Sequence, residues 1–262
     1  MKLAWLTDIH LNFVEFDNRK RFYSSIRETQ ADAILISGDV AEAATLIEEL
    51  NEIERHVDLP IYFVLGNHDF YRSSISNVHA RLRIMPLRNL TWLTDAPVRL
   101  LTSQTALIGD DGWADGRLGD YLNSRVMLND YVLINEFAGL NAGARLKLMQ
   151  ELGDAAATRL SAKLLEACAQ RKRVILVTHV PPFPEACWYD GKRSDKEWLP
   201  HFSCKAIGDS IVEVMDQHPD CELLVLCGHT HGAGFVQIRP NVAVKTGGAV
   251  YGQPVIQEII DA

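Results

Sequence analysis

The sequence predicts a single domain that combines α-helices with mixed β-sheets. Three observations support this. In the first third of the chain, apolar runs of strand length alternate with longer segments that suit helices. Beyond residue 90 the apolar runs become shorter and tight turns join them, which is typical of antiparallel or mixed pairing. The 262 residues are 47% hydrophobic, with no linker-like stretch or internal repeat, so we expect one domain over residues 1–262.

The first third reads as β-α-β-α-β. Residues 2–7 and 33–37 are apolar runs of strand length, and the polar, helix-compatible segment 16–30 lies between them. A second helix is expected over 41–56, where apolar residues recur at helical spacing, and a third strand over 60–65. Since helices connect these strands, we expect the strands to be parallel and buried on both faces.

The middle of the chain predicts shorter elements. A polar helix is expected near 72–85. Short strands follow at 91–93, 98–101 and 104–108, and they look antiparallel or mixed. Residues 109–153 begin with a loop-like stretch and show no clear period.

The last part predicts alternating helices and strands again. Asp154 is the predicted N-cap of a helix that ends near residue 171, ahead of a strand at 174–177. Residues 180–202 contain four prolines and two tryptophans, which predicts a long surface loop. We expect this segment and residues 109–140 to be insertions that could cover a site. The final elements are a helix over 203–217, a strand over 223–227, a hairpin turning at 240–241 and a strand over 254–259.

Charge and composition narrow the class of partner. The net charge of −8 repels nucleic-acid backbones and anionic membranes, so an anionic substrate must be attracted locally. The N-terminus has no signal-peptide pattern, and no apolar run approaches the roughly 20 residues that span a bilayer. The five cysteines never form a CxxC pair, which suits reduced thiols. We therefore expect a cytoplasmic protein.

Clusters of polar side chains follow the C-terminal ends of five predicted strands, which is the edge where open α/β sheets bind ligands. The clusters are Asp8-Ile9-His10, Gly38-Asp39, Gly66-Asn67-His68-Asp69, Thr178-His179 and Gly228-His229-Thr230-His231. The first and last clusters each hold two ligand-type residues at alternate positions, so both side chains project to one side of an extended backbone. The glycines just before the ligands permit unusual dihedral angles and close backbone approach.

The donor types indicate a metal centre. Imidazole and carboxylate together suit intermediate ions such as zinc, manganese or iron. Seven candidates are more than one tetrahedral ion can use, but two ions that share a bridging carboxylate can use them. Two divalent ions and two carboxylates leave a charge of roughly +2, or about +1 with a bridging hydroxide, which would attract a phosphoryl group. The candidate ligands are Asp8, His10, Asp39, Asn67, His179, His229 and His231.

The five clusters, in this order, resemble the calcineurin-like metallophosphoesterase family. A single Asp-x-His or Gly-Asp is common, but a specified tetrapeptide such as Gly66–Asp69 arises by chance about once in a thousand chains of this length. The resemblance covers most of the chain. It implies a four-layer α/β/β/α fold in which helices flank two mixed sheets, whereas the residue pattern alone reaches only a mixed α/β sandwich.

The resemblance also implies a role for each residue. One metal would take Asp8, His10 and His231, and the second would take Asn67, His179 and His229. Asp39 would bridge the two ions, and a bridging water or hydroxide would attack phosphorus in line. His68 would not bind metal but would serve the phosphoryl group as leaving-group acid or electrostatic stabiliser, with Asp69 as its orienting partner.

The predicted function is metal-dependent hydrolysis of phosphate esters, by a phosphodiesterase acting on a small or nucleotide-like substrate. The Asp8-x-His10 cluster together with residues 178–182 resembles the bacterial cyclic-nucleotide phosphodiesterase branch. Phosphomonoesterase action and a non-catalytic binding scaffold are the alternatives. Four histidines outside the strand ends are predicted to be structural or exposed, namely His56, His79, His201 and His218. Four aromatic residues could stack a base or sugar or could simply pack, namely Trp113, Trp188, Tyr189 and Trp198.

Overall fold

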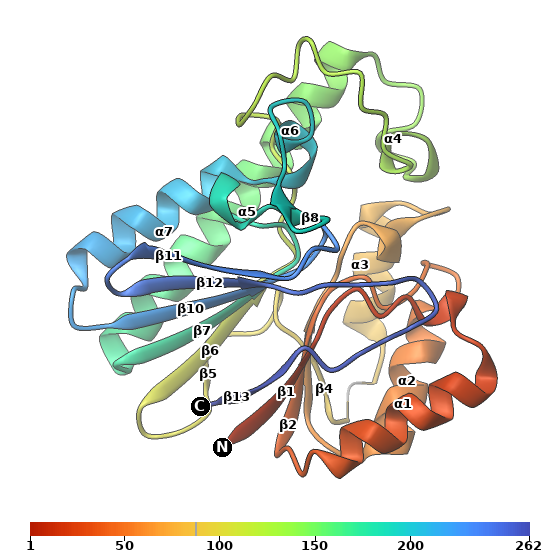
Figure 1. Cartoon of the computed structure of the whole chain (residues 1–262), viewed down its shortest axis with the longest axis vertical. Helices are drawn as coiled ribbons and strands as arrows, with labels where there is room; N and C mark the ends of the chain where they lie inside the picture. The colour runs from red at the N-terminus through yellow and green to blue at the C-terminus, as the bar shows by residue number, and fades with distance from the viewer. Residues whose placement is uncertain (87) are drawn as a thin grey trace.

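Two β-sheets pack face to face, and helices cover the outer face of each (Figure 1). The computed structural model describes residues 1–86 and 88–262. The sheets have the strand orders β13-β1-β2-β3-β4 and β11-β12-β10-β7-β6-β5. The predicted α/β architecture of two mixed sheets flanked by helices is confirmed.

The first sheet follows the predicted β-α-β-α-β order. Its strands are β1 (Lys2–Leu6), β2 (Ala33–Ser37), β3 (Ile61–Val64), β4 (Leu90–Trp92) and β13 (Glu258–Asp261). The first three are parallel neighbours, as expected, and every residue of β2 is buried. The covering helices, on the right of Figure 1, are α1 (Phe16–Glu28), α2 (Leu46–Val57) and α3 (Ile75–Ile84).

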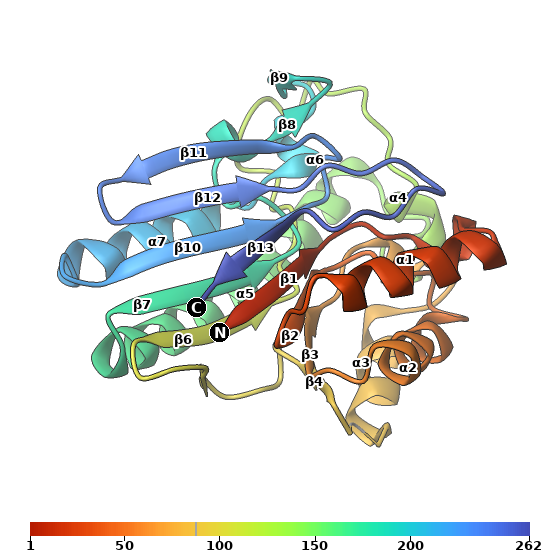
Figure 2. The same ribbon diagram turned by 60° about the horizontal axis from the view of Figure 1, so that its bottom comes forward.

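Two details of this sheet differ from the sequence prediction. β4 pairs parallel to β3, because α3 returns the chain to the starting edge before the strand begins. The last strand begins at Glu258 rather than near residue 254, since its pairing with β1 starts where Glu258 lies opposite Trp5. It runs antiparallel to β1, so the chain ends lie side by side (Figure 2).

The second sheet has a parallel centre and antiparallel edges. Its strands are β5 (Arg99–Leu100), β6 (Thr105–Asp110), β7 (Arg173–Thr178), β10 (Glu222–Cys227), β11 (Gly234–Arg239) and β12 (Val242–Thr246). β6, β7, β10 and β12 are parallel, while β5 and β11 are antiparallel to their neighbours. The predicted hairpin turn at 240–241 joins β11 to β12. The helices α5 (Ala142–Gln170) and α7 (Lys205–Gln217) cover the outer face.

The long helix α5 begins thirteen residues before the predicted start. Its N-cap is Asn141, whose side-chain oxygen accepts a hydrogen bond of 3.0 Å from the backbone N–H of Ala144. Asp154, the predicted cap, lies inside the helix and pairs with Arg117. The prediction failed because Gly153 precedes Asp154 and resembles a helix break, whereas a Cβ at Gly153 would lie 2.7 Å from the Cβ of Asp115. Close packing against Asp115, and not a break in the helix, therefore explains the glycine at position 153.

The layer between the sheets is a separate apolar cluster. Large side chains from both sheets meet there, among them Leu3, Trp5, Leu35, Leu107 and Ile175, each no more than 3% exposed. A strand that is apolar on both faces packs one face against the covering helices. Its opposite face packs against the second sheet. The two sheets are held in fixed relative position, which brings loops from both to one edge.

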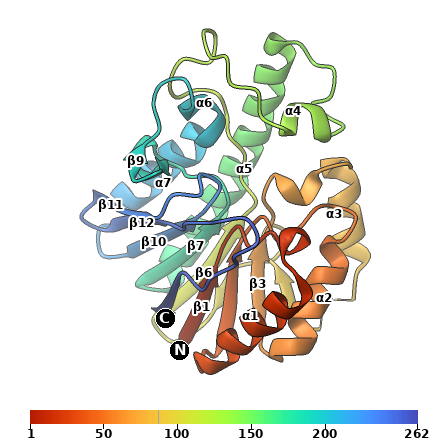
Figure 3. The same cartoon turned by 45° about the vertical axis from the view of Figure 1, so that its right-hand side comes forward.

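Short elements lie over the C-terminal ends of the strands, and two of them, α4 and α6, are at the top of Figures 1 and 3. They are η1 (Leu11–Phe13), η2 (His68–Phe70), α4 (Asp130–Leu133), η3 (Pro184–Ala186), β8 (Trp188–Tyr189), β9 (Lys192–Arg193) and α6 (Leu199–Phe202). Residues 180–202 are therefore more ordered than the predicted surface loop, and His201 within them is 2% exposed. None of the helices formed by residues 1–86 and 88–262 combines the length and apolarity needed to cross a membrane.

Candidate metal centre

All five predicted clusters meet where the C-terminal ends of β1, β2 and β3 face those of β7 and β10. Most of their side chains are buried, with Asp8 3%, Asp39 1% and His179 1% exposed. Five of the candidate ligands have positive φ angles, a conformation that is uncommon outside glycine and costs of order 1 kcal/mol or more per residue. They are Asp8, His10, Asp39, His229 and His231. The backbone is strained where these donors gather.

A first donor group consists of Asp8, His10, Asp39 and His231. One potential ligand atom from each lies within 4.8 Å of the others. Nε2 of His231 is 3.3 Å from Nε2 of His10 and 3.4 Å from Oδ1 of Asp8. Nε2 of His10 is 3.7 Å from Oδ2 of Asp39. These nitrogen and oxygen atoms converge on one point, as ligands of a common cation do.

A second donor group lies next to the first. Oδ1 of Asn67 is 3.0 Å from Nε2 of His179 and 2.9 Å from Nδ1 of His229. Oδ1 of Asp39 is 3.5 Å from Nε2 of His179. The two oxygens of Asp39 therefore face different groups, Oδ2 toward His10 and Oδ1 toward His179.

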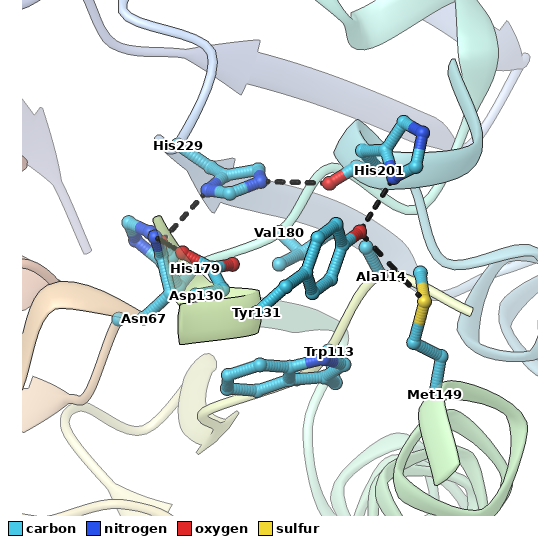
Figure 4. Close-up of a pocket in the computed structure, with 12 residues that line it drawn as sticks. Asn67, Trp113, Ala114, Asp130, Tyr131, Met149, His179, Val180, His201 and His229 are labelled. Atoms are coloured by element: carbon cyan, nitrogen blue, oxygen red, sulfur yellow. Dashed lines mark hydrogen bonds between the residues drawn. The ribbon is translucent and has the colours of Figure 1, made fainter. Parts of the chain in front are cut away.

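Hydrogen bonds fix which nitrogen of two histidines faces the second group. Nδ1 of His179 is 2.8 Å from the carbonyl of Ser37, and Nε2 of His229 is 3.0 Å from the carbonyl of His201 (Figure 4). Because a carbonyl only accepts, each of these nitrogens carries the proton. The other nitrogen of each ring presents a lone pair to the donor group, which is the tautomer that a metal requires.

The electrostatics of the centre suit a cation. Burial lowers the pKa of His10 to about 3 and that of His229 to about 4, so both imidazoles are neutral at pH 7. Burial, together with the nearby Asp8 and Asp69 carboxylates, raises the pKa of Asp39 well above its usual range. Burial raises the pKa of Asp8 too, but the hydrogen bond with His231 and the adjacent imidazoles outweigh it and leave that pKa lowered. Neutral imidazoles, two carboxylates and an amide oxygen form a donor set that fits intermediate divalent ions.

His68 lies at the open rim between the two groups. Its backbone N–H donates to Oδ1 of Asp39 at 2.9 Å, and its ring Nε2 is 3.9 Å from Oδ2. The ring stacks on Tyr71 with centroids 4.2 Å apart and remains 13% exposed. Burial, reinforced by the neighbouring His10 and His179, lowers the pKa of His68 to about 2. His68 is thus a neutral ring with access to the space above both groups.

Asp69 does not make the contact expected of it. The sequence suggested that Asp69 orients the ring of His68, but η2 turns its carboxylate into the protein interior. There it accepts four backbone N–H bonds of 2.8–3.0 Å. The donors are Asp39, Val40, Ala41 and Gly66. Asp69 therefore joins the loop after β2 to the loop after β3, and it acts on the ligands through their backbone.

At two positions a carboxylate approaches the backbone so closely that only glycine fits. A Cβ at Gly66 would lie 2.2 Å from Oδ1 of Asp39, and a Cβ at Gly228 would lie 2.1 Å from Oδ2 of Asp8. Either atom would displace the carboxylate of a candidate ligand.

Three residues at the centre have no signal in the sequence. Tyr251, in the loop before β13, lies at the mouth with its ring 4.6 Å from that of His10 and its hydroxyl 3.5 Å from Nε2 of His68. Tyr71 supports His68 from the other side. Asp130, on α4, accepts a hydrogen bond from the side chain of Asn67 (Figure 4). These three residues are identified by their contacts with distant parts of the chain, which local sequence patterns do not reveal.

The histidines that the sequence predicted to be structural or exposed differ in whether they lie near the donor groups. His56 is partly exposed and stacks on Tyr23, while His79 lies 3.1 Å from a carboxylate oxygen of Asp111. His201, in contrast, is buried beside the second donor group and its carbonyl supports His229. His201 is structural, as expected, but it belongs to the surroundings of the centre.

A cavity of about 200 Å³ opens above the two donor groups, and both His68 and Tyr251 line it. A second cavity of about 540 Å³ adjoins it and shares Tyr189 and Phe202 with it. Trp198 also lines the second cavity, and its ring centroid is 5.2 Å from that of Phe202. Lys192 and Arg193 add positive charge along the second cavity, although Asp190 and Asp195 line it as well.

A model of the calcineurin-like phosphoesterase family matches residues 1–233. Among solved structures, a dimetal phosphatase from Danio rerio aligns with a TM-score of 0.60 and 14% identity, over 95% of this chain and 87% of that one. Phosphopantetheinyl hydrolase from Mycobacterium tuberculosis aligns with a TM-score of 0.66 and 15% identity, over 96% and 90% of the two chains. At these identities the likeness shows the fold alone.

A curated protein from Bos taurus, described as a transmembrane protein with metallophosphoesterase domain, is 31% identical over 98 residues. The match covers 34% of this chain and only 22% of that protein.

Proposed function

Because this chain belongs to the calcineurin-like phosphoesterase family, we propose that it is a two-metal phosphodiesterase that acts on a small, nucleotide-like phosphate ester. One observation carries this proposal: two groups of metal-type donors lie side by side, and the two oxygens of Asp39 face one group each. A carboxylate so placed suits two cations at once.

The proposed ligands divide as the donor groups do. The first ion would be held by Asp8, His10 and His231, and the second by Asn67, His179 and His229. Asp39 would hold both ions, and manganese, iron and zinc all suit these donors. When bound, two such cations supply positive charge to the phosphoryl group and lower the pKa of the attacking water.

The protein's own groups would orient the ester and stabilise the developing charge. A phosphoryl group above the donor groups would lie beside His68, whose neutral ring can donate one N–H to a phosphoryl or leaving-group oxygen. This favours His68 as an electrostatic stabiliser over a proton donor. Burial raises the pKa of Tyr251 to about 12, so its hydroxyl keeps its proton and can donate a second hydrogen bond from the mouth.

The adjoining cavity supports an organic substituent on the substrate. From His229 an aromatic path leads through Phe202 to Trp198, with successive centroids 5.2 Å apart. Planar rings stack on such side chains, and cations beside them suit a further anionic group. We therefore place the base-like or aryl part of a diester in this cavity. Residues 180–202, which line this cavity, and residues 109–140 would be insertions within one catalytic domain over residues 1–262.

The test compares a diester with a monoester. Purified protein loaded with manganese is assayed on bis-p-nitrophenyl phosphate and on p-nitrophenyl phosphate. We expect faster turnover of the diester, and Trp198→Ala is expected to raise its KM while leaving that of a methyl p-nitrophenyl diester nearly unchanged. Faster monoester turnover would establish a phosphomonoesterase instead. Well under one manganese ion per chain after loading would indicate a binding scaffold.

We also propose a cytoplasmic location. The five cysteines are free thiols, and four of them are buried. This arrangement is typical of reducing compartments. Alkylation of the denatured protein with and without prior reduction, read by mass spectrometry, tests for free thiols, because equal labelling is expected in both samples.

A further inference from the structure

The second donor group has an outer layer of support that comes from α4, within segment 109–140. Oδ1 of Asp130 accepts a hydrogen bond of 2.8 Å from the side-chain Nδ2 of Asn67. It accepts another of 2.7 Å from the hydroxyl of Tyr71, which is itself 3.2 Å from the same Nδ2. Asp130 is 4% exposed, so water competes little for these bonds.

Asp130 determines which end of the Asn67 amide faces the centre. Oδ1 of Asp130 accepts from both Nδ2 of Asn67 and the hydroxyl of Tyr71, so the amide turns its NH₂ toward Asp130. The carbonyl Oδ1 then points at His179 and His229, at 3.0 and 2.9 Å. If the amide were reversed, its NH₂ would face the same two nitrogens and would repel a cation.

The next residue, Tyr131, supports the other side of the same group through His201. The hydroxyl of Ser124 donates to the carbonyl of Glu197 at 2.8 Å, so its oxygen accepts from Nε2 of His201 at 2.9 Å. Nδ1 of His201 then accepts from the hydroxyl of Tyr131, as Figure 4 shows. The His201 ring is fixed at both nitrogens.

His201 passes this support to a proposed ligand. Its carbonyl accepts from Nε2 of His229 at 3.0 Å and so keeps Nδ1 of His229 directed at the donor group.

The first donor group is supported from elsewhere. Oδ2 of Asp8 accepts a hydrogen bond of 2.6 Å from Thr7, its neighbour on the loop after β1. Its two oxygens also lie 3.1 and 3.2 Å from the backbone nitrogen of His229. Loops of the two central sheets therefore hold the first group, whereas α4 reaches only the second.

We propose that Asp130 and Tyr131 are positioning residues that set the cation affinity of the second donor group and leave that of the first unchanged. This inference rests on the proposed function only in taking each donor group to bind a cation. Segment 109–140 is then part of the metal centre as well as its cover, and the affinity of one ion depends on how that segment docks.

The test is a calorimetric titration of the full chain with manganese after chelation. We expect two binding steps in the unsubstituted protein. Asp130→Ala should weaken one step by about 10–100-fold, the usual effect of losing a hydrogen-bond partner of a ligand, and should leave the other step unchanged. Asp130→Asn keeps an oxygen that can accept from Asn67, so a smaller loss is expected if orientation matters more than charge.

Two further variants make the result specific. Thr7→Val is the matched control, because it removes the hydrogen bond to Asp8 and should weaken the step that Asp130→Ala spares. Tyr131→Phe removes only the hydroxyl and should weaken the same step as Asp130→Ala. It also provides an answer should Asp130→Ala fail to fold, which circular dichroism of the metal-free protein would reveal.

The inference would be overturned by a single binding step in the unsubstituted protein, by equal weakening of both steps, or by no change in Asp130→Ala and Tyr131→Phe. Because the titration contains no substrate, its result is independent of catalysis. Selective weakening in a protein that hydrolyses no phosphate ester would uphold the inference and refute the proposed function.

Discussion

At the scale of single residues, Asp39 and His68 are neighbours with different proposed tasks. Asp39 is buried and directs an oxygen toward each donor group, whereas His68 keeps part of its ring exposed at the rim. In the proposed function, one side chain would hold cations and the other would contact the substrate. Substitution can separate these tasks, because metal content and turnover are measured independently.

Asp39→Asn tests the bridging role. The amide loses the negative charge that two cations would share, so we expect metal content to fall below two ions per chain and activity to be lost. Elemental analysis after manganese loading measures the first effect and diester hydrolysis the second. Full metal content with normal turnover would refute the assignment.

His68→Ala tests the role at the substrate. We expect both ions to remain and kcat to fall by roughly 10² to 10⁴, the usual contribution of a positioned acid, base or hydrogen-bond donor. His56→Ala is the matched control, since that ring stacks on Tyr23 away from the centre. Loss of metal from His68→Ala would mean that His68 is itself a ligand.

At the scale of elements, the ends of the strands carry the proposed ligands, and short elements between the strands support several of those side chains. The ends of β1, β2, β3, β7 and β10 carry the predicted ligands. Several supporting contacts come from α4 and α6, short helices within residues 109–140 and 180–202. This division explains why the pattern of strands predicts the ligands but not their supports.

Substitution at the start of α5 tests whether Asn141 is the N-cap of this helix. Asn141→Ala removes the hydrogen bond to the N–H of Ala144 and should lower the free energy of unfolding by about 1 kcal/mol. Asp154→Ala is the control, because Asp154 lies within the helix with its side chain 60% exposed, and a change within about 0.5 kcal/mol is expected. Urea denaturation measures both, and the opposite ranking would place the cap at Asp154.

At the scale of the whole molecule, the centre joins the two sheets. Asp8, His10, Asp39 and Asn67 come from the first sheet, and His179, His229 and His231 come from the second. A cation bound by both sets would cross-link the two halves of the sandwich. Without cations, buried carboxylates and imidazoles would face each other with no counter-ion, which is unfavourable.

Metal removal should therefore destabilise the fold. A ligand that binds only the folded state at 100 times its Kd stabilises it by about 2.7 kcal/mol, which corresponds to about 5–10 °C in Tm for a chain of this size. We expect chelation to lower Tm by this amount and added manganese to restore it. Asp39→Asn should respond much less, and an unchanged Tm on chelation of the loaded protein would contradict the cross-link.

The sequence by itself determined the order of the strands along the chain, the fold class and the candidate ligands. Apolar runs such as Ala33–Ser37 and the Gly66–Asp69 motif are local, so one chain displays them directly. It did not determine the inward turn of Asp69, the parallel pairing of β4 or the start of α5 at Ala142.

Only the tertiary structure decided which residues support the ligands. Asn67 and Asp130 are 63 residues apart in sequence, and His68 and Tyr251 are 183 apart. Contacts between residues so far apart in sequence depend on how loops from the two sheets dock against each other. The local periodicity of the sequence does not predict this docking. The local sequence pattern therefore predicted the donor residues, while packing between distant segments determined how their side chains are oriented.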